Sequence, residues 1–234
     1  MLIITGTGRS GTATLARIFG GHHEFRVRYI LDKYFQGADP AVDPFDALEK
    51  RLAAMLDLHQ GIDRTTFIDS SNLYIHFIDA IYLLDPSARF ALSVRNGKDF
   101  VRSAFSRGWH EQNIFGTVPL RDDPYFTRWG SMSPLQKNAW IWTWRNKKAL
   151  KGLEGIPAGQ KMILRIEDIK KEETLGRLAA FAGLPVHHRE LAEKGCNANP
   201  SFSLPPKEEW TRQMNDEFDG IAGEMMRVLG YGGD

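Results

Sequence analysis

The chain has 234 residues, and its 30 basic and 29 acidic side chains leave a formal net charge of +1. This length is enough for one α/β domain with a sizeable core, and the even charge gives no reason to expect nucleic acid or an anionic membrane surface as a partner. The one cysteine, Cys196, excludes an intrachain disulfide, and we interpret it as an inert loop thiol. No apolar run approaches the roughly 18 residues of a membrane span and no secretion signal is evident, so we expect a cytoplasmic protein without membrane attachment.

The first fifteen residues carry the most informative pattern. An apolar run over residues 2–5 breaks into a glycine-rich turn that opens a helix, and the turn reads Gly6-Thr7-Gly8-Arg9-Ser10-Gly11-Thr12. Glycines let backbone N–H groups crowd around an anion, and the start of a helix adds its positive end at the same place. The loop therefore predicts a site for a phosphate-like anion.

The same loop departs from the nucleotide-triphosphate P-loop, G-x-x-x-x-G-K-[ST], although Gly6 and Gly11 have its spacing. Thr12 stands at the lysine position, and Ala13 stands at the Ser/Thr position. The lysine that holds the β- and γ-phosphates and the hydroxyl that holds Mg²⁺ are therefore both missing, and the basic residue of the loop is Arg9. We expect an anion site that uses no metal.

Beyond this loop, short apolar strands alternate with helices. We expect strands over residues 2–5, 65–69, 89–95 and 161–165. We expect helices from the first loop to about residue 20 and over residues 45–59, 72–84, 97–107, 133–153, 172–182 and 208–229. His22 and His23 we place on a surface loop. The pattern predicts one α/β domain over residues 1–234, with a P-loop-like three-layer α/β/α arrangement, a central parallel sheet, and a long aromatic loop or lid over about residues 108–133.

Ligands of parallel sheets bind at the carboxyl ends of the strands, and one such end carries a second signal. Arg95 closes the third strand, and Ser103 lies eight residues on, inside the following helix. Together with the first loop, this pair resembles the sulfotransferases that use 3′-phosphoadenosine 5′-phosphosulfate (PAPS). Further segments are also similar to that family, namely Arg165-Ile166-Glu167-Asp168, Phe181-Ala182-Gly183-Leu184-Pro185 and the closing stretch from Trp210 to Tyr231.

The resemblance implies a PAPS-dependent sulfotransferase with a role for each matching residue. The 5′-phosphosulfate would be held by the first loop, at Gly8, Arg9, Ser10, Gly11, Thr12 and Ala13, and the 3′-phosphate by Arg95 and Ser103. Sulfuryl transfer is an in-line displacement in which positioning and charge stabilisation do most of the work. Arg9 is therefore also a candidate catalytic residue, because its guanidinium can meet the charge that grows on the leaving phosphate. The product would be 3′-phosphoadenosine 5′-phosphate (PAP).

The acceptor hydroxyl must lose a proton, so a general base is required. Asp69 is the first candidate, because it ends a predicted strand at the edge that carries ligands. Its alternative interpretation is a helix cap before Asn72. Glu24, Asp32 and His110 are the reserve candidates.

Other interpretations stay open at this point. Arg95 could pair with Asp99 on the surface of the helix. The chain could be a P-loop nucleotide kinase or NTPase, or a nucleotide-binding protein without catalysis. For a sulfotransferase, the acceptor would be a hydroxyl or amine of a small molecule or a glycan, and the sequence does not indicate an oligomeric state.

Overall fold

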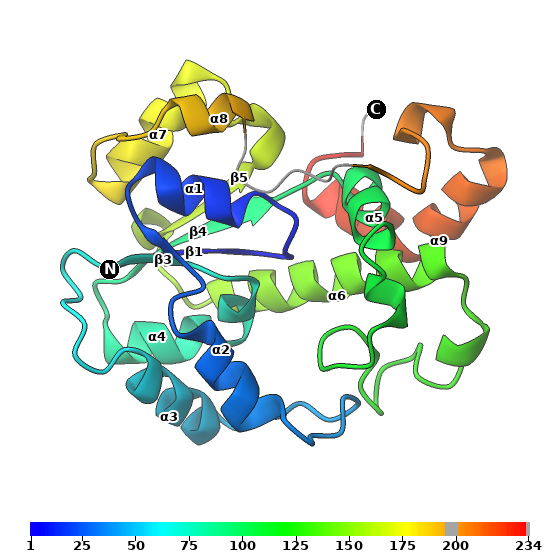
Figure 1. The fold of residues 1–234 in the computed structure, drawn as a ribbon, viewed down its shortest axis with the longest axis horizontal. Helices are drawn as coiled ribbons and strands as arrows, with labels where there is room; N and C mark the ends of the chain where they lie inside the picture. The colour runs from blue at the N-terminus through cyan, green and yellow to red at the C-terminus, as the bar shows by residue number, and fades with distance from the viewer. Residues whose placement is uncertain (195–200, 233–234) are drawn as a thin grey trace. The chain divides into compact units, whose positions relative to one another are not determined.

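The computed structural model describes residues 1–194 and 201–232 (Figure 1). Cys196 lies outside the described residues. The chain divides into two compact units: the first comprises Met1–Tyr34, Phe45–Val94 and Lys148–Ala198, and the second comprises Phe35–Pro44, Arg95–Lys147 and Asn199–Asp234. The expectation of a single domain stays a prediction.

The first unit contains a parallel sheet, as the alternating pattern predicted. Within the described residues the sheet has five strands in the order β2-β3-β1-β4-β5, and every neighbouring pair is parallel. The strands are β1 (Leu2–Gly6), β2 (His22–His23), β3 (Ile68–Ser70), β4 (Arg89–Val94) and β5 (Lys161–Arg165). This confirms the predicted α/β class with a P-loop-like arrangement.

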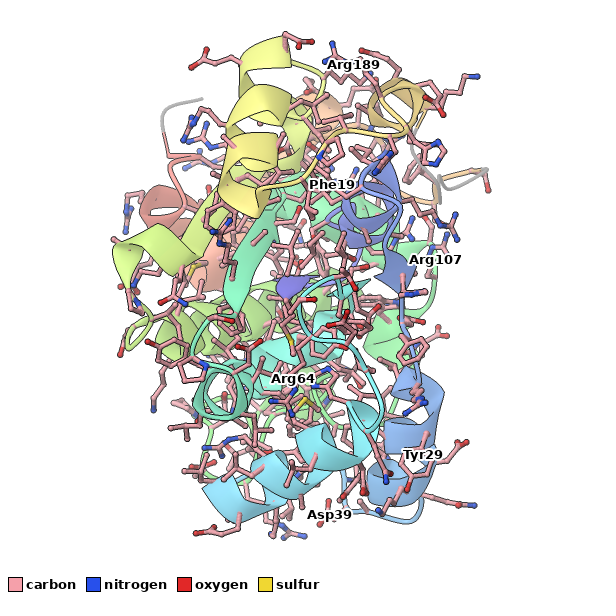
Figure 2. The ribbon with its side chains drawn as sticks, turned by 90° about the vertical axis from the view of Figure 1, so that its left-hand side faces the viewer. Phe19, Tyr29, Asp39, Arg64, Arg107 and Arg189 are labelled. Atoms are coloured by element: carbon pink, nitrogen blue, oxygen red, sulfur yellow. The ribbon has the colours of Figure 1, made fainter. Side chains whose placement is uncertain are left out.

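Helices cover both faces of this sheet. Figure 1 shows α1 (Thr12–Ile18), α7 (Glu172–Ala182) and α8 (Glu190–Lys194) on one side and α3 (Leu48–Leu58) and α4 (Ile78–Leu84) on the other. Side chains alternate along β1, so Leu2 and Ile4 pack with the first group of helices and Ile3 faces the second. Phe19, at the end of α1, lies inside the first layer, whereas Arg189 lies at its surface (Figure 2).

Several predicted bounds were wrong. The helix expected from residue 45 begins at Leu48, because the ring of Phe45 is fully buried against Phe77 at a centroid distance of 4.6 Å. The helix expected over residues 72–84 is a 3₁₀ turn, Asn72–His76, followed by α4. His22 and His23 form the short edge strand β2 where a loop was expected. The sequence analysis also missed α8, α2 (Val27–Ile30) and the π-helical turn Leu31–Phe35.

The second unit is helical. It holds α5 (Gly97–Phe105), most of α6 (Pro134–Leu153) and α9 (Arg212–Val228), with 3₁₀ turns at Trp109–Glu111, Trp129–Ser131 and Lys207–Glu209. Gly97 is required where it stands, because a Cβ there would collide with the ring of Phe218 and touch Trp142. The indole of Trp142 is buried in this unit and donates a hydrogen bond to the carbonyl of Arg95 at 3.2 Å.

Candidate functional site

The loop between β1 and α1 has the backbone of an anion cradle. Gly8, Arg9 and Gly11 have positive φ angles of 78°, 54° and 76°. Glycine adopts this conformation at no cost, but a non-glycine residue such as Arg9 pays for it, and such strain gathers at functional sites. Turns built in this way direct successive N–H groups toward one point, which is the geometry that binds phosphate oxygens.

Ser10 is the most informative side chain of the cradle. It is fully buried, and its Oγ has no hydrogen-bond partner. The carbonyl of Ser10 accepts a hydrogen bond from the hydroxyl of Ser93 on β4, which fixes the loop to the sheet. A Cβ on Gly6 would collide with Ser10 Oγ and with the Ser93 carbonyl. A buried hydroxyl without a hydrogen-bond partner destabilises the folded protein. A ligand that supplies the missing partner therefore binds more tightly.

The positions that separate this loop from a P-loop lie at the start of α1. Thr12 begins the helix and is buried, and Ala13 follows it with a half-buried side chain. Gly11 precedes the helix as its N-cap, without a capping side chain, and a Cβ there would collide with the Ile166 side chain. The helix start therefore offers backbone N–H donors and the hydroxyl of Thr12, and Ala13 supplies no side chain that could ligate a metal.

Strand β3, the neighbour of β1, is followed by polar residues at the same carboxyl edge of the sheet. Thr5 donates from Oγ1 to the carbonyl of Ser71 at 2.9 Å, and the Ser71 N–H donates to the carbonyl of Ile4 at 3.2 Å. Ser71 Oγ accepts a hydrogen bond from the N–H of Leu73 at 3.1 Å and so caps the 3₁₀ turn that follows. The capping role that the sequence left open for Asp69 therefore belongs to Ser71.

Asp69 is buried in the first unit. Its carboxylate accepts a hydrogen bond from the hydroxyl of Tyr74 at 2.5 Å and another from the N–H of Phe25 at 3.3 Å. Burial raises the pKa of Asp69, and the hydrogen bonds from Tyr74 and Phe25 oppose that rise. Its assignment as the base stays a prediction, with both carboxylate oxygens already engaged inside the unit.

The three reserve candidates have different surroundings. Glu24 and Asp32 are exposed in the first unit, Glu24 with a positive φ of 57°. His110 belongs to the second unit, where its Nδ1 lies 3.2 Å from the side-chain amide nitrogen of Asn138. Its Nε2 lies 3.5 Å from the carboxylate of Glu111. Burial lowers the pKa of His110.

The second predicted phosphate-binding pair lies in the second unit. Arg95 directly follows β4 in the chain and is half-buried, and Ser103 is buried in α5. Asp99, the partner that the sequence left open for Arg95, pairs with Lys207 at 3.2 Å. The assignment of Arg95 and Ser103 to a 3′-phosphate stays a prediction.

The sequence analysis placed His23 on a surface loop and gave it no function. In the structure, His23 lies on strand β2 of the sheet that carries the cradle. It ends β2, and its Nδ1 lies 2.7 Å from the hydroxyl of Ser70 on β3. The only local signal was its position after the first helix, in a stretch too short and too polar to suggest a strand.

In the ranges 1–194 and 201–232, no three His, Cys, Asp or Glu side chains are grouped so as to hold a metal ion. Within those same ranges, no helix is long and apolar enough to cross a membrane.

The fold of the chain is similar to that of proteins with solved structures. No family profile matches the chain, and no curated protein does. Among solved structures, it is similar to the sulfotransferase domain from the curacin biosynthetic pathway, with 15% sequence identity and a TM-score of 0.58 over 99% of this chain and 97% of that one. It is also similar to a sulfotransferase from Alicyclobacillus acidocaldarius, with 16% identity and a TM-score of 0.54 over 97% of this chain and 93% of that one. The chain therefore has a sulfotransferase-like α/β fold.

Proposed function

We propose that the chain is a sulfotransferase that moves a sulfuryl group from PAPS to a hydroxyl or amine of a small-molecule or glycan acceptor. The observation that carries this proposal is the cradle after β1. It has the backbone of a phosphate-binding loop and an orphaned buried hydroxyl at Ser10, but Thr12 and Ala13 replace the lysine and the magnesium ligand of a kinase. The sulfotransferase-like fold supports it.

The cradle residues fit the 5′ end of the donor. The N–H groups around Gly8 and Gly11 and the guanidinium of Arg9 would hold the phosphate oxygens, and Ser10 Oγ and Thr12 would add hydroxyl donors. An arginine stays charged and can donate to two oxygens at once. Because these groups are in place before the reaction, they can stabilise charge that grows on the phosphate as it leaves.

The chemistry that this site would perform needs no metal. The acceptor oxygen attacks sulfur, the bond from sulfur to the 5′-phosphate oxygen breaks, and that oxygen keeps the electron pair. The acceptor proton passes to a base. A sulfuryl group carries less negative charge than a phosphoryl group, so arginine and backbone donors can replace the cation that kinases use.

Arg95 and Ser103 are assigned to the 3′-phosphate, which ADP and ATP lack. A site that pairs an arginine with the 3′-phosphate discriminates against a nucleotide that lacks this phosphate. The aromatic loop of about residues 108–133 is proposed to shape the acceptor side.

Transfer from PAPS tests the proposal. The protein is incubated with PAPS and a panel of hydroxyl- and amine-bearing metabolites and glycans, and PAP release and sulfated products are measured by chromatography and mass spectrometry. We expect PAP release that depends on one acceptor class and is lost in Arg9→Ala but kept in Arg17→Ala, at an exposed arginine of α1, the helix that follows the cradle. PAP binding without release on any acceptor would favour a nucleotide-binding protein without catalysis.

A further inference from the structure

We propose that His23 is the base that takes the proton from the acceptor, and that Ser70 is the positioning residue that orients its ring. This inference rests on the proposed sulfuryl transfer. It is carried by the sheet register, by the contact between the two side chains, and by the backbone that follows β2.

The register places His23 on the same face of the sheet as the cradle. His23 pairs with Ser70, and Ser70 pairs with Ile4 of β1. Paired residues of a parallel sheet point to the same side, and Ile4 packs with the layer that contains α1. Strands lie about 4.8 Å apart, so the His23 backbone is about 10 Å from β1, whose end opens the cradle. An acceptor bound at the cradle would have to span this distance for its hydroxyl to reach His23.

The contact with Ser70 leaves one ring nitrogen for chemistry. His23 Nδ1 lies 2.7 Å from Ser70 Oγ, and Ser70 is fully buried. When Nδ1–H donates to that hydroxyl, Nε2 carries the free lone pair. The His23 side chain is 25% exposed, and its Nε2 lies 4.0 Å from the carboxylate of Glu24. A base needs this combination of an anchored nitrogen, an open nitrogen and a nearby negative charge that stabilises the imidazolium.

The backbone after β2 is strained and firmly held. Among the described residues, the non-glycine residues with positive φ are Arg9 in the cradle and Glu24 and Arg26 after β2, at 54°, 57° and 54°. The N–H of Glu24 donates to the carbonyl of Ser70 at 2.8 Å, and the N–H of Phe25 donates to Asp69. Strain of this kind persists only where surrounding contacts enforce it, and it marks functional segments. On this account, Asp69 holds the turn that presents His23.

In the proposed step, the proton of the acceptor O–H moves to His23 Nε2 as the oxygen attacks sulfur. The sulfur–oxygen bond to the 5′-phosphate breaks, and the leaving phosphate keeps its electron pair. Glu24 faces the imidazolium that results. No other reactant is needed.

Nitrogen-15 NMR of the imidazole rings tests the geometry without an acceptor. We expect the Nδ1–H tautomer at His23 in the wild type, and its loss in Ser70→Ala because the hydroxyl acceptor is gone. His22 is the internal control: it points to the other face and packs against Phe25 at a centroid distance of 5.2 Å. An Nε2–H tautomer at His23 in the wild-type protein would overturn the proposal, because the open nitrogen would then have no lone pair.

Turnover tests the chemistry. With the acceptor that the panel identifies, His23→Gln should lower PAP release by about 100-fold or more, the usual contribution of a general base, while PAP affinity stays unchanged. His22→Gln should stay within about threefold of wild type, and Ser70→Ala should fall between the two. Full turnover in His23→Gln would refute the assignment while leaving the sulfotransferase proposal intact. A wild-type protein that binds no PAP would instead refute the proposed function.

Discussion

Tyr74 donates a hydrogen bond from its hydroxyl to Oδ2 of Asp69 at 2.5 Å, and both side chains are buried in the first unit. Burial raises the pKa of both groups, and the neighbouring charge of Asp69 raises the pKa of Tyr74 further. Asp69 also accepts the N–H of Phe25, so this pair connects β3 to the turn after β2.

Tyr74→Phe should destabilise the protein. The substitution keeps the ring but removes the donor, and a buried carboxylate that loses one partner costs about 1–3 kcal/mol. Urea unfolding at neutral pH measures this loss. The matched control is Tyr82→Phe, at a half-buried tyrosine of α4, which should change the free energy of unfolding by less than about 0.5 kcal/mol. Equal stability of Tyr74→Phe and wild type would show that the pair contributes little.

The pH dependence of stability should change in Asp69→Asn. The raised pKa of Asp69 means that the folded protein holds this proton above pH 3.8, where the unfolded chain has lost it. The carboxyl group therefore contributes stability at low pH that is lost as pH rises from 3.8 through its folded pKa. The free energy of unfolding of Asp69→Asn, relative to wild type, should improve between about pH 4 and neutral pH. A constant difference across that range would contradict the raised pKa.

Asp69→Asn also separates the two candidate bases. If Asp69 is the base, turnover should fall as far as in His23→Gln, and PAP affinity should be unchanged. If it holds the turn instead, turnover should fall less than in His23→Gln, because the base itself remains. PAP release measured side by side for the two variants decides between them.

Gly6→Ala should damage the cradle. The added Cβ would collide with the Ser10 hydroxyl and the backbone carbonyl of Ser93, and the backbone cannot yield cheaply. Overpacking of this kind costs about 1–3 kcal/mol. Gly176→Ala is the control, because nothing lies near that helical glycine and alanine should stabilise α7 by up to about 1 kcal/mol. Thermal unfolding of both variants should give shifts of opposite sign.

Arg145 anchors the aromatic loop within the second unit. It is buried on α6, its Nε donates to the carbonyl of Gly116 at 3.1 Å, and its guanidinium lies 4.7 Å from the centre of the Trp109 ring. Burial lowers its pKa to about 10, so it keeps its charge at neutral pH. Arg145→Met should speed amide hydrogen exchange over residues 109–118, and Lys147→Met, at an exposed position of the same helix, should not. Unchanged exchange in Arg145→Met would show that other contacts hold the loop.

The regular elements of the fold could be predicted from sequence where local signals agree. The strand β5 and the helix α7 begin and end where the pattern placed them, because apolar periodicity and flanking turns coincide there. The strand β2 could not be predicted, since two histidines form a strand only by pairing with β3. The expected start of α3 at residue 45 was wrong because Phe45 lies before the helix, with its ring buried against Phe77.

In the candidate site, too, local features could be predicted from the sequence and long-range contacts could not. The cradle follows from the spacing of Gly6 and Gly11, a local pattern that the positive φ angles of Gly8 and Gly11 match. The contact between His23 and Ser70 joins residues 47 positions apart in sequence, and only the sheet register brings them together. A base that depends on strand order cannot be read from the spacing of residues along the chain.

Arg9→Ala should weaken binding of the donor's 5′ end. A hydrogen-bonded charge contributes about 1.5–3 kcal/mol, so PAP affinity should fall by about 10- to 150-fold. Arg17→Ala, at the exposed end of α1, should leave the affinity unchanged. Wild-type affinity in Arg9→Ala would remove Arg9 from the site.

Calorimetric titration with PAP, beside ADP and beside ATP with and without Mg²⁺, tests the central claim most directly. A PAPS-dependent enzyme should bind PAP in the micromolar range and bind ADP at least about tenfold more weakly, with no effect of Mg²⁺, because the 3′-phosphate distinguishes the ligands and the cradle has no metal ligand. Binding of ATP that requires Mg²⁺ and ignores the 3′-phosphate would contradict the account and favour a nucleotide kinase.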